Sequence, residues 1–186
     1  MTIIGITGSI ASGKTTVAQL TAQKKYPLFN ADKIVLNLYK NRNFVNVLIK
    51  KFKLKKRKNI KAQIKILIKK NKNELIKLES IIHPLIRKKM LNFLKIKKKI
   101  LILEIPLLIE NKLSKYFDKI VFVDAKKKLR LKRYLKRNND QKIFETLNRK
   151  QLSPAVKKRA CDLVINNNYS LVILKKNVKK FIKMYE

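Results

Sequence analysis

The sequence predicts an α/β fold in which helices flank a parallel sheet. Runs rich in apolar residues alternate with helical patterns along most of the 186 residues, as expected when each strand is followed by a crossover helix. The runs at 2–7, 100–104 and 119–124 are almost entirely apolar, which is typical of strands buried on both faces of a sheet. The first run leads directly into a glycine loop and a helix start.

The glycine loop has the spacing G-x-x-x-x-G-K-[ST], formed by Gly8, Gly13, Lys14 and Thr15. In this pattern backbone N–H groups surround a phosphate, the lysine reaches the β- and γ-phosphates, and the threonine hydroxyl ligates Mg²⁺. The start of the next helix adds its positive dipole end. The chain has 3 glycines, and the third, Gly5, lies in the same stretch. We predict a P-loop NTPase or kinase; the alternative is a strand-to-helix turn that matches by chance.

A second short strand and an acidic helix start follow the first helix, which is expected over 14–24. The strand is predicted within 27–32, and Asp32 opens the next helix. Because ligands of α/β sheets lie outside the carboxyl ends of the strands, Asp32 could face the phosphates. It could equally be the N-cap of its helix.

The stretch from 41 to 72 has a loose helical pattern, interrupted by a lysine-rich run at 53–58, and predicts a solvated insertion. Residues 73–90 have apolar side chains at helical spacing, and Pro84 predicts a break with a fresh helix starting at the proline. His83, the single histidine of the chain, is placed at that break as a structural hydrogen-bonding group or as a catalytic one.

Two further features lie at the ends of the later strands. Glu104 ends its apolar run where an acid can hold Mg²⁺ through water, and Pro106 then stops strand pairing. Residues 160–167 predict the last strand, and a C-terminal helix follows it.

A basic helix is predicted over 125–137, after the strand that ends at Asp124. It carries Arg130, Arg133 and Arg137 on one face. Guanidinium groups bind phosphate oxygens at two points, so this face is predicted to contact phosphate; the alternative is a solvated charged face.

Composition limits the class of protein. Length and a 46% hydrophobic content predict one compact body. The absence of a transmembrane-length run and of a signal-peptide pattern predicts a cytoplasmic protein without membrane contact. Cys161 is the single cysteine, which excludes an internal disulfide and suggests a small buried or half-buried filler. The net charge of +37 allows weak, non-specific nucleic-acid binding, but an AT-biased genome would also produce this spread of lysine, asparagine and isoleucine.

Taken together, these stretches resemble the dephospho-CoA kinases over nearly the whole chain. The matching stretches are the loop at 5–16, Asn30–Asp32 for the family's Asp-Ala-Asp, Leu78–Pro84, Pro106–Glu110, the helix at 130–137, Gln151, and 161–167. The chain departs from the family at Asn30, where the family has aspartate, and at Arg130, where it often has glutamine.

The resemblance implies one P-loop kinase domain over 1–186. Its core would comprise 1–32, 99–125 and 160–186, with a helical CoA-binding insertion at about 33–98 and a helical lid at about 126–150. It implies transfer of a phosphoryl group from ATP, with Mg²⁺, to the ribose 3′-hydroxyl of dephospho-CoA, and we expect a monomer.

The resemblance also implies the site. Asp32 would be the general base, with Lys14 and Arg137 as the other catalytic residues. Thr15 and Asp32 would hold Mg²⁺, possibly through water. The ATP site would comprise Gly8, Ala11, Ser12, Gly13, Lys14, Thr15, Thr16, Arg133, Arg137 and Asn166. The acceptor site would comprise Asp32, His83, Arg87, Pro106, Leu107 and Glu110.

Two other functions fit parts of the pattern. Another P-loop kinase, acting on a nucleoside or nucleotide, would share the loop but not the His-Pro and Pro-Leu-Leu-x-Glu elements. A basic nucleic-acid-binding NTPase would account for the charge, and its binding would collapse as salt rises.

Overall fold

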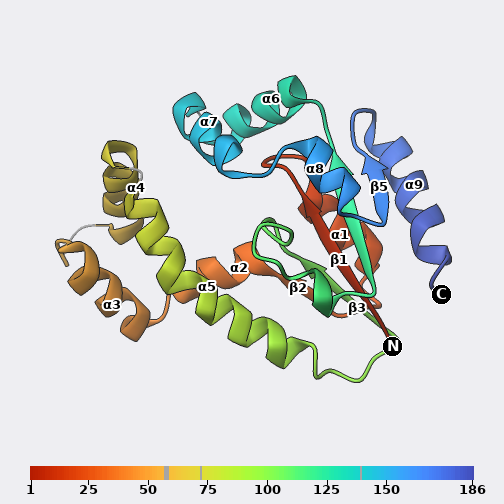
Figure 1. Ribbon diagram of the computed structural model, residues 1–186, viewed down its shortest axis with the longest axis horizontal. Coiled ribbons are helices and arrows are strands. Elements are labelled where there is room, and N and C mark those ends of the chain that lie inside the picture. Colours follow the sequence, from red (N-terminus) through yellow and green to blue (C-terminus); the bar gives the residue numbers. More distant parts are fainter. Residues whose placement is uncertain (57–58, 72, 139) are drawn as a thin grey trace. The chain divides into compact units, whose positions relative to one another are not determined.

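Five parallel strands form one sheet in the computed structural model, which describes residues 1–56, 59–71, 73–138 and 140–186 (Figure 1). The strand order is β2-β3-β1-β4-β5 and every pairing is parallel, which confirms the predicted α/β class. The strands are β1 (Thr2–Gly8), β2 (Leu28–Asn30), β3 (Ile100–Glu104), β4 (Lys119–Asp124) and β5 (Leu163–Asn166).

One face of the sheet is covered by the first and last helices, α1 (Lys14–Ala22) and α9 (Leu171–Lys183). Their apolar side chains share a buried cluster with alternate residues of β1, β3 and β4, as a period of two along each strand requires. Ile4 and Ile6 of β1 lie at its centre and are fully buried. This cluster fixes the central strand, and therefore the place where the glycine loop begins.

Three helices of the described chain lie between β4 and β5, and a 3₁₀ turn precedes β4. Helices α7 and α8 begin after Asp140 and Ser153, whose side chains accept a backbone N–H of the first turn. Pro154 at the first position of α8 has the backbone angle that a helix start needs. The elements are η1 (Ser114–Tyr116), α6 (Lys127–Asn138), α7 (Gln141–Lys150) and α8 (Pro154–Arg159).

The chain divides into two compact units, residues 1–30 with 96–186, and residues 31–95. We call them the sheet unit and the helical unit. The helical unit has its own core, in which Leu48 is fully buried among aromatic and aliphatic side chains. Of the lysine-rich run at 53–58, residues 57–58 lie outside the described part. The helices are α2 (Ala31–Leu38), α3 (Arg42–Phe52), α4 (Ile60–Lys70) and α5 (Asn73–Phe93).

The break predicted at Pro84 is wrong, because α5 runs without interruption through the proline. Proline removes one backbone hydrogen bond from a helix and crowds the preceding turn. Buried side chains lie on both sides of it, among them Leu78, Ile82 and Met90. Packing on both sides therefore holds the helix together where local preference would interrupt it, and His83 lies inside a helix rather than at a junction.

Three other sequence predictions are corrected in detail. The first helix ends at Ala22 rather than Lys24, because Gln23 takes a left-handed conformation with φ of 50°. The last strand is limited to Leu163–Asn166. Asp32 is the second residue of α2, so it lies within the first turn and is not the N-cap.

Replacing Pro84 by Ala is expected to raise the free energy of unfolding by about 1–3 kcal/mol, because alanine supplies the missing N–H donor and removes the crowded ring. Chemical denaturation, monitored by circular dichroism, measures the free energy of unfolding. Lys88→Ala, at an exposed position one turn further along α5, should change the value by less than about 0.5 kcal/mol. A loss of stability in Pro84→Ala would contradict this expectation and show that the proline stabilises the helix where it stands.

Candidate phosphate-binding site

The start of α1 differs from the starts of α7, α8 and α9 in the sheet unit. Helices α7, α8 and α9 each follow an Asp or Ser whose side chain accepts a first-turn N–H. The N-cap of α1 is Gly13, which has no side chain to do this. The N–H groups of the first turn of a helix have no partner within the helix. The N-terminal end of α1 therefore presents N–H donors and the positive end of the helix dipole, and both suit an anion.

Two glycines make the loop before α1 possible. Gly13 has φ of 94°, and a Cβ built there would lie 2.2 Å from Nδ2 of Asn167. A Cβ on Gly8 would lie 2.6 Å from the carbonyl oxygen of Val123 and 2.7 Å from Oγ of Ser12. At position 13 both the backbone angle and the contact exclude a side chain, and at position 8 the contacts exclude it.

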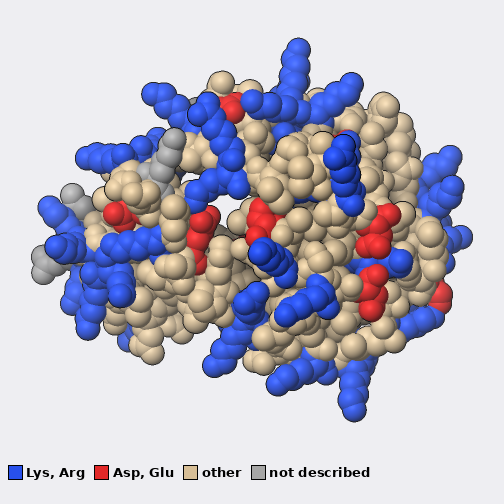
Figure 2. Space-filling model, viewed as in Figure 1, with Lys and Arg blue, Asp and Glu red and all other residues tan. Residues whose placement is uncertain are grey.

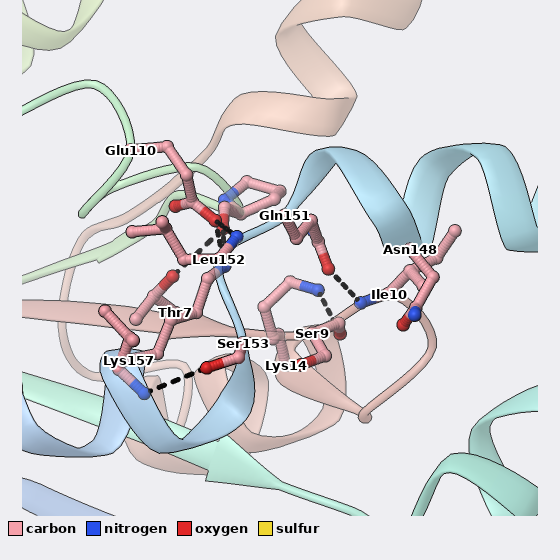
Figure 3. Close-up of polar contacts among 12 residues, drawn as sticks. Thr7, Ser9, Ile10, Lys14, Glu110, Asn148, Gln151, Leu152, Ser153 and Lys157 are labelled. Atoms are coloured by element: carbon pink, nitrogen blue, oxygen red, sulfur yellow. Dashed lines mark hydrogen bonds and ion pairs between the residues drawn. The ribbon is translucent and has the colours of Figure 1, made fainter.

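Polar groups inside the loop complete a cradle for phosphate. Lys14 is largely buried, and its Nζ donates to the carbonyl oxygen of Ser9 at 3.1 Å, a contact drawn in Figure 3. Ser12 is fully buried, and its hydroxyl has no hydrogen-bond partner among the described residues. Ala11 takes a left-handed φ of 57°. A buried hydroxyl without a partner is costly, and a phosphate oxygen would satisfy it.

Three oxygen and nitrogen groups meet at the carboxyl end of β3. The Thr15 hydroxyl donates to Oε1 of Glu104 at 2.7 Å, and Nδ2 of Asn30 donates to Oε2 of the same carboxylate. Glu104 is 1% exposed. Hydroxyl and carboxylate oxygens are the ligands that Mg²⁺ prefers, usually one or two of them beside substrate phosphates. The described residues contain no group of three or more candidate metal ligands, and this smaller donor set fits that pattern.

The three arginines of α6 have different surroundings, so the prediction that they share a phosphate-binding face is wrong for Arg130. Arg130 is 3% exposed and donates to Ala125, Ile10 and Asn148. Burial lowers the pKa of its guanidinium. It is neither solvated nor open to a ligand.

The other two arginines are less enclosed. Arg133 donates to the carbonyl oxygens of Asn167 at 2.9 Å and Ser12 at 3.5 Å, so it contacts the loop itself. Arg137 is exposed and makes no polar contact with the part of the chain that the structure describes. The described residues therefore leave the donors of Arg137 available for a ligand.

The end of β5 contacts the loop through Asn167. Its Nδ2 donates to the carbonyl oxygen of Ser12 at 2.8 Å, and the residue is buried. Asn166, the residue singled out from the sequence, is exposed and accepts a hydrogen bond from the backbone of Asn168 at 2.9 Å. The adjacent asparagines gave no signal to choose between them, because only the fold shows which one fills the space beside Gly13.

The segment after β3 is fixed by a buried ion pair. Nζ of Lys157 lies 2.6 Å from Oε1 of Glu110 and donates to the carbonyl oxygen of Pro106 at 3.2 Å. The Thr7 hydroxyl donates to the same carbonyl at 3.1 Å. Lys157 is fully buried, yet no sequence signal separates it from the many surface lysines. Leu107 is half-buried in this segment.

In the helical unit, Asp32 and Arg87 are exposed and His83 is half-buried. This unit also contains a pocket of about 620 Å³. The three sequence-predicted residues lie outside the set that lines it, which comprises Lys33, Leu36, Asn37, Tyr39, Lys40, Val45, Asn59, Ile60 and Lys61.

Asp32 stands apart among the 11 acidic residues. The other ten have polar partners: Asp118 and Asp162 accept backbone N–H groups, for example, and Asp124 pairs with Lys158. Asp32 has no polar contact with the described residues. No described side chain or backbone group engages its carboxylate, which leaves the carboxylate available for chemistry.

The basic side chains are spread widely. Figure 2 shows Lys and Arg over most of the visible face rather than in one patch. Among the described residues, no helix is both long and apolar enough to cross a bilayer. Cys161 is half-buried, as predicted, and burial raises the pKa of its thiol to about 11.

The fold and the loop define a P-loop kinase class. A protein titled TT1252 from Thermus thermophilus has a similar structure, with a TM-score of 0.80 and 26% identity, over 100% of this chain and 98% of that one. A dephospho-CoA kinase structure from Campylobacter jejuni has the same fold, with a TM-score of 0.67 and 24% identity, over 100% of this chain and 97% of that one.

Sequence comparisons show the family. The family model described as dephospho-CoA kinase matches residues 2–172. A dephospho-CoA kinase of Fusobacterium nucleatum is 36% identical over 189 aligned positions, which cover 96% of each chain. The chain belongs to the dephospho-CoA kinase family and is a transferase with an alcohol group as acceptor.

Replacing Gly13 by Ala is expected to lower the free energy of unfolding by about 2–4 kcal/mol, from backbone strain and the contact with Asn167. In an Asn167→Ala background the contact is absent, so the same change should cost only about 1–2 kcal/mol. A double-mutant cycle measured by denaturation compares the two costs. Equal costs in both backgrounds would contradict the close approach of Asn167 to Gly13.

Proposed function

We propose that this chain phosphorylates the ribose 3′-hydroxyl of dephospho-CoA with ATP, which gives coenzyme A in the last step of its biosynthesis. The observation that carries the donor half is the uncapped start of α1 behind the two-glycine loop. Family membership supports the acceptor half. The reaction forms a bond between the 3′-oxygen and the γ-phosphorus and breaks the bond to the bridging oxygen, releasing ADP.

The loop would bind the triphosphate through the N–H groups at the start of α1 and the Lys14 ammonium. The buried Ser12 hydroxyl, which has no partner among the described residues, would donate to a phosphate oxygen. Thr15 would hold Mg²⁺ directly, with Glu104 or Asp32 acting through water. Bound Mg²⁺ neutralises charge on the phosphates.

Asp32 would accept the proton of the 3′-hydroxyl. Its exposure and its lack of polar partners among the described residues support this role. A carboxylate suffices as the base, because phosphoryl transfer depends mainly on positioning and electrostatics. Asp32 is the second residue of α2, so the helix holds the backbone from which this carboxylate extends.

Arg137 would stabilise the charge on the transferred phosphoryl group. Of the two arginines predicted for this task, Arg133 already donates to the carbonyl oxygens of Ser12 and Asn167. We therefore assign charge stabilisation to Arg137 and maintenance of the loop to Arg133. An arginine in this position is worth about 10³–10⁵ in rate in related phosphoryl transfers.

The helical unit would bind the rest of the acceptor. Its pocket is lined by apolar side chains with Lys33, Lys40 and Lys61 among them, a combination that suits a long chain carrying a diphosphate. His83, Arg87 and the Pro106–Glu110 segment complete the proposed acceptor contacts. A monomer with a cytoplasmic location, and only non-specific attraction to nucleic acid, form part of the same proposal.

Replacing Asp32 by Asn is expected to lower kcat by about 10²–10⁴, the usual contribution of a general base, with nearly unchanged ATP affinity. The assay is ADP release with Mg²⁺, ATP and dephospho-CoA. Glu74→Gln is the matched control, because it also removes an acid from the first turn of a helix in the same unit; it should retain full activity.

Adenosine and a nucleoside monophosphate serve as control acceptors in this assay. Turnover with dephospho-CoA alone supports the acceptor. Turnover with a control acceptor instead would favour another small-molecule kinase, and an active Asp32→Asn variant would exclude Asp32 as the base.

A further inference from the structure

Both backbone polar groups of Ile10, in the phosphate loop, are held by side chains from elsewhere in the chain. The Ile10 N–H donates to Oε1 of Gln151 at 2.8 Å, as the dashed line in Figure 3 shows. The Ile10 carbonyl oxygen accepts from Nη1 of Arg130 at 3.3 Å. Gln151 and Arg130 both lie in the segment that follows β4, so a part of the chain more than a hundred residues away fixes the backbone of Ile10.

Arg130 is anchored before it reaches the loop. Its Nε donates to the carbonyl oxygen of Ala125 at 3.0 Å, and Nη1 donates to Oδ1 of Asn148 at 2.7 Å. The guanidinium carbon also lies 5.8 Å from the centre of the Phe144 ring, within cation–π range. A cation this well buried must keep its partners, so its position beside Ile10 is fixed.

Gln151 is anchored through its neighbours in the chain. It caps the end of α7, and the next N–H, that of Leu152, donates to Oε1 of Glu110 at 3.1 Å. The same carboxylate oxygen pairs with the fully buried Lys157. Ser153 then caps α8. The backbone at Gln151 is thus tied on both sides, and its carboxamide reaches Ile10 from a fixed point.

We propose that Gln151 and Arg130 are positioning residues for the nucleotide, which hold the backbone N–H and carbonyl of Ile10 so that the loop has its binding shape before a phosphate arrives. This inference rests on the proposed use of ATP as donor. A loop that is ordered in advance loses less conformational freedom on binding, so its affinity for phosphate is higher. Gln151 accepts the Ile10 N–H, so that donor is already used within the protein. The N–H groups at the start of α1 are separate donors and stay available to the phosphates.

Gln151→Met tests the contact, because methionine has similar length but lacks the strong acceptor. Calorimetry without any acceptor should show ATP and ADP binding weakened by about tenfold, the usual effect of losing one hydrogen bond. In kinetics the KM for ATP should rise by a similar factor, while kcat and the KM for the acceptor stay unchanged. Gln141→Ala, at the exposed start of the same helix, should match the wild type in every measurement.

Amide hydrogen exchange at Ile10 gives an independent measurement on the nucleotide-free protein. Exchange should be slow in the wild type and in Gln141→Ala, and faster in Gln151→Met. Unchanged exchange and unchanged nucleotide affinity would overturn the inference. So would a uniform loss of Tm, kcat and both KM values, which would indicate a purely structural role.

The two proposals fail in different ways. If the wild type binds ATP but does not phosphorylate dephospho-CoA, the proposed acceptor is wrong. The ATP and ADP affinities of Gln151→Met still decide the inference in that case, because binding is measured without an acceptor.

Discussion

The close contact between Gly13 and Asn167 is the constraint on which the site depends. The Asn167 amide occupies the space where any other residue at position 13 would place its Cβ, and it binds the carbonyl oxygen of Ser12. Asn167 follows β5 directly, so the last strand of the sheet shapes the first loop. The start of α1 is thereby kept free of a side-chain cap, and its donors remain available for phosphate.

Because the chain has few acidic residues, the role of each carboxylate can be followed in the structure. In a chain with 48 basic and 11 acidic residues, the carboxylates hold strands, cap helices and pair with lysines at fixed points. Glu104 and Glu110 are used inside the sheet unit, one beside the loop and one beside Lys157. Asp32 alone has no such use among the described residues, which is what a residue reserved for proton transfer would show.

Local signals predicted the features that depend on local physics. The apolar runs gave the parallel strands, and the glycine spacing gave the loop, because backbone angle and burial are written into short stretches. The uninterrupted helix through Pro84 could not be predicted, since side chains on both sides of the proline hold it. Lys157 was equally hidden, because a lysine in a lysine-rich chain acquires its task only from distant contacts. Gln151 was matched to the family from the sequence, but its hydrogen bond to Ile10 was not predicted, because that contact joins distant parts of the chain.

The most direct test of the central claim is to follow a label on the γ-phosphoryl group of ATP when the chain is supplied with Mg²⁺ and dephospho-CoA. Phosphorus NMR and fragment masses of the product then locate the labelled group. The account predicts the label on the ribose 3′-oxygen of the product, with unlabelled ADP. Label that is found only in inorganic phosphate, or on a different oxygen, would contradict it.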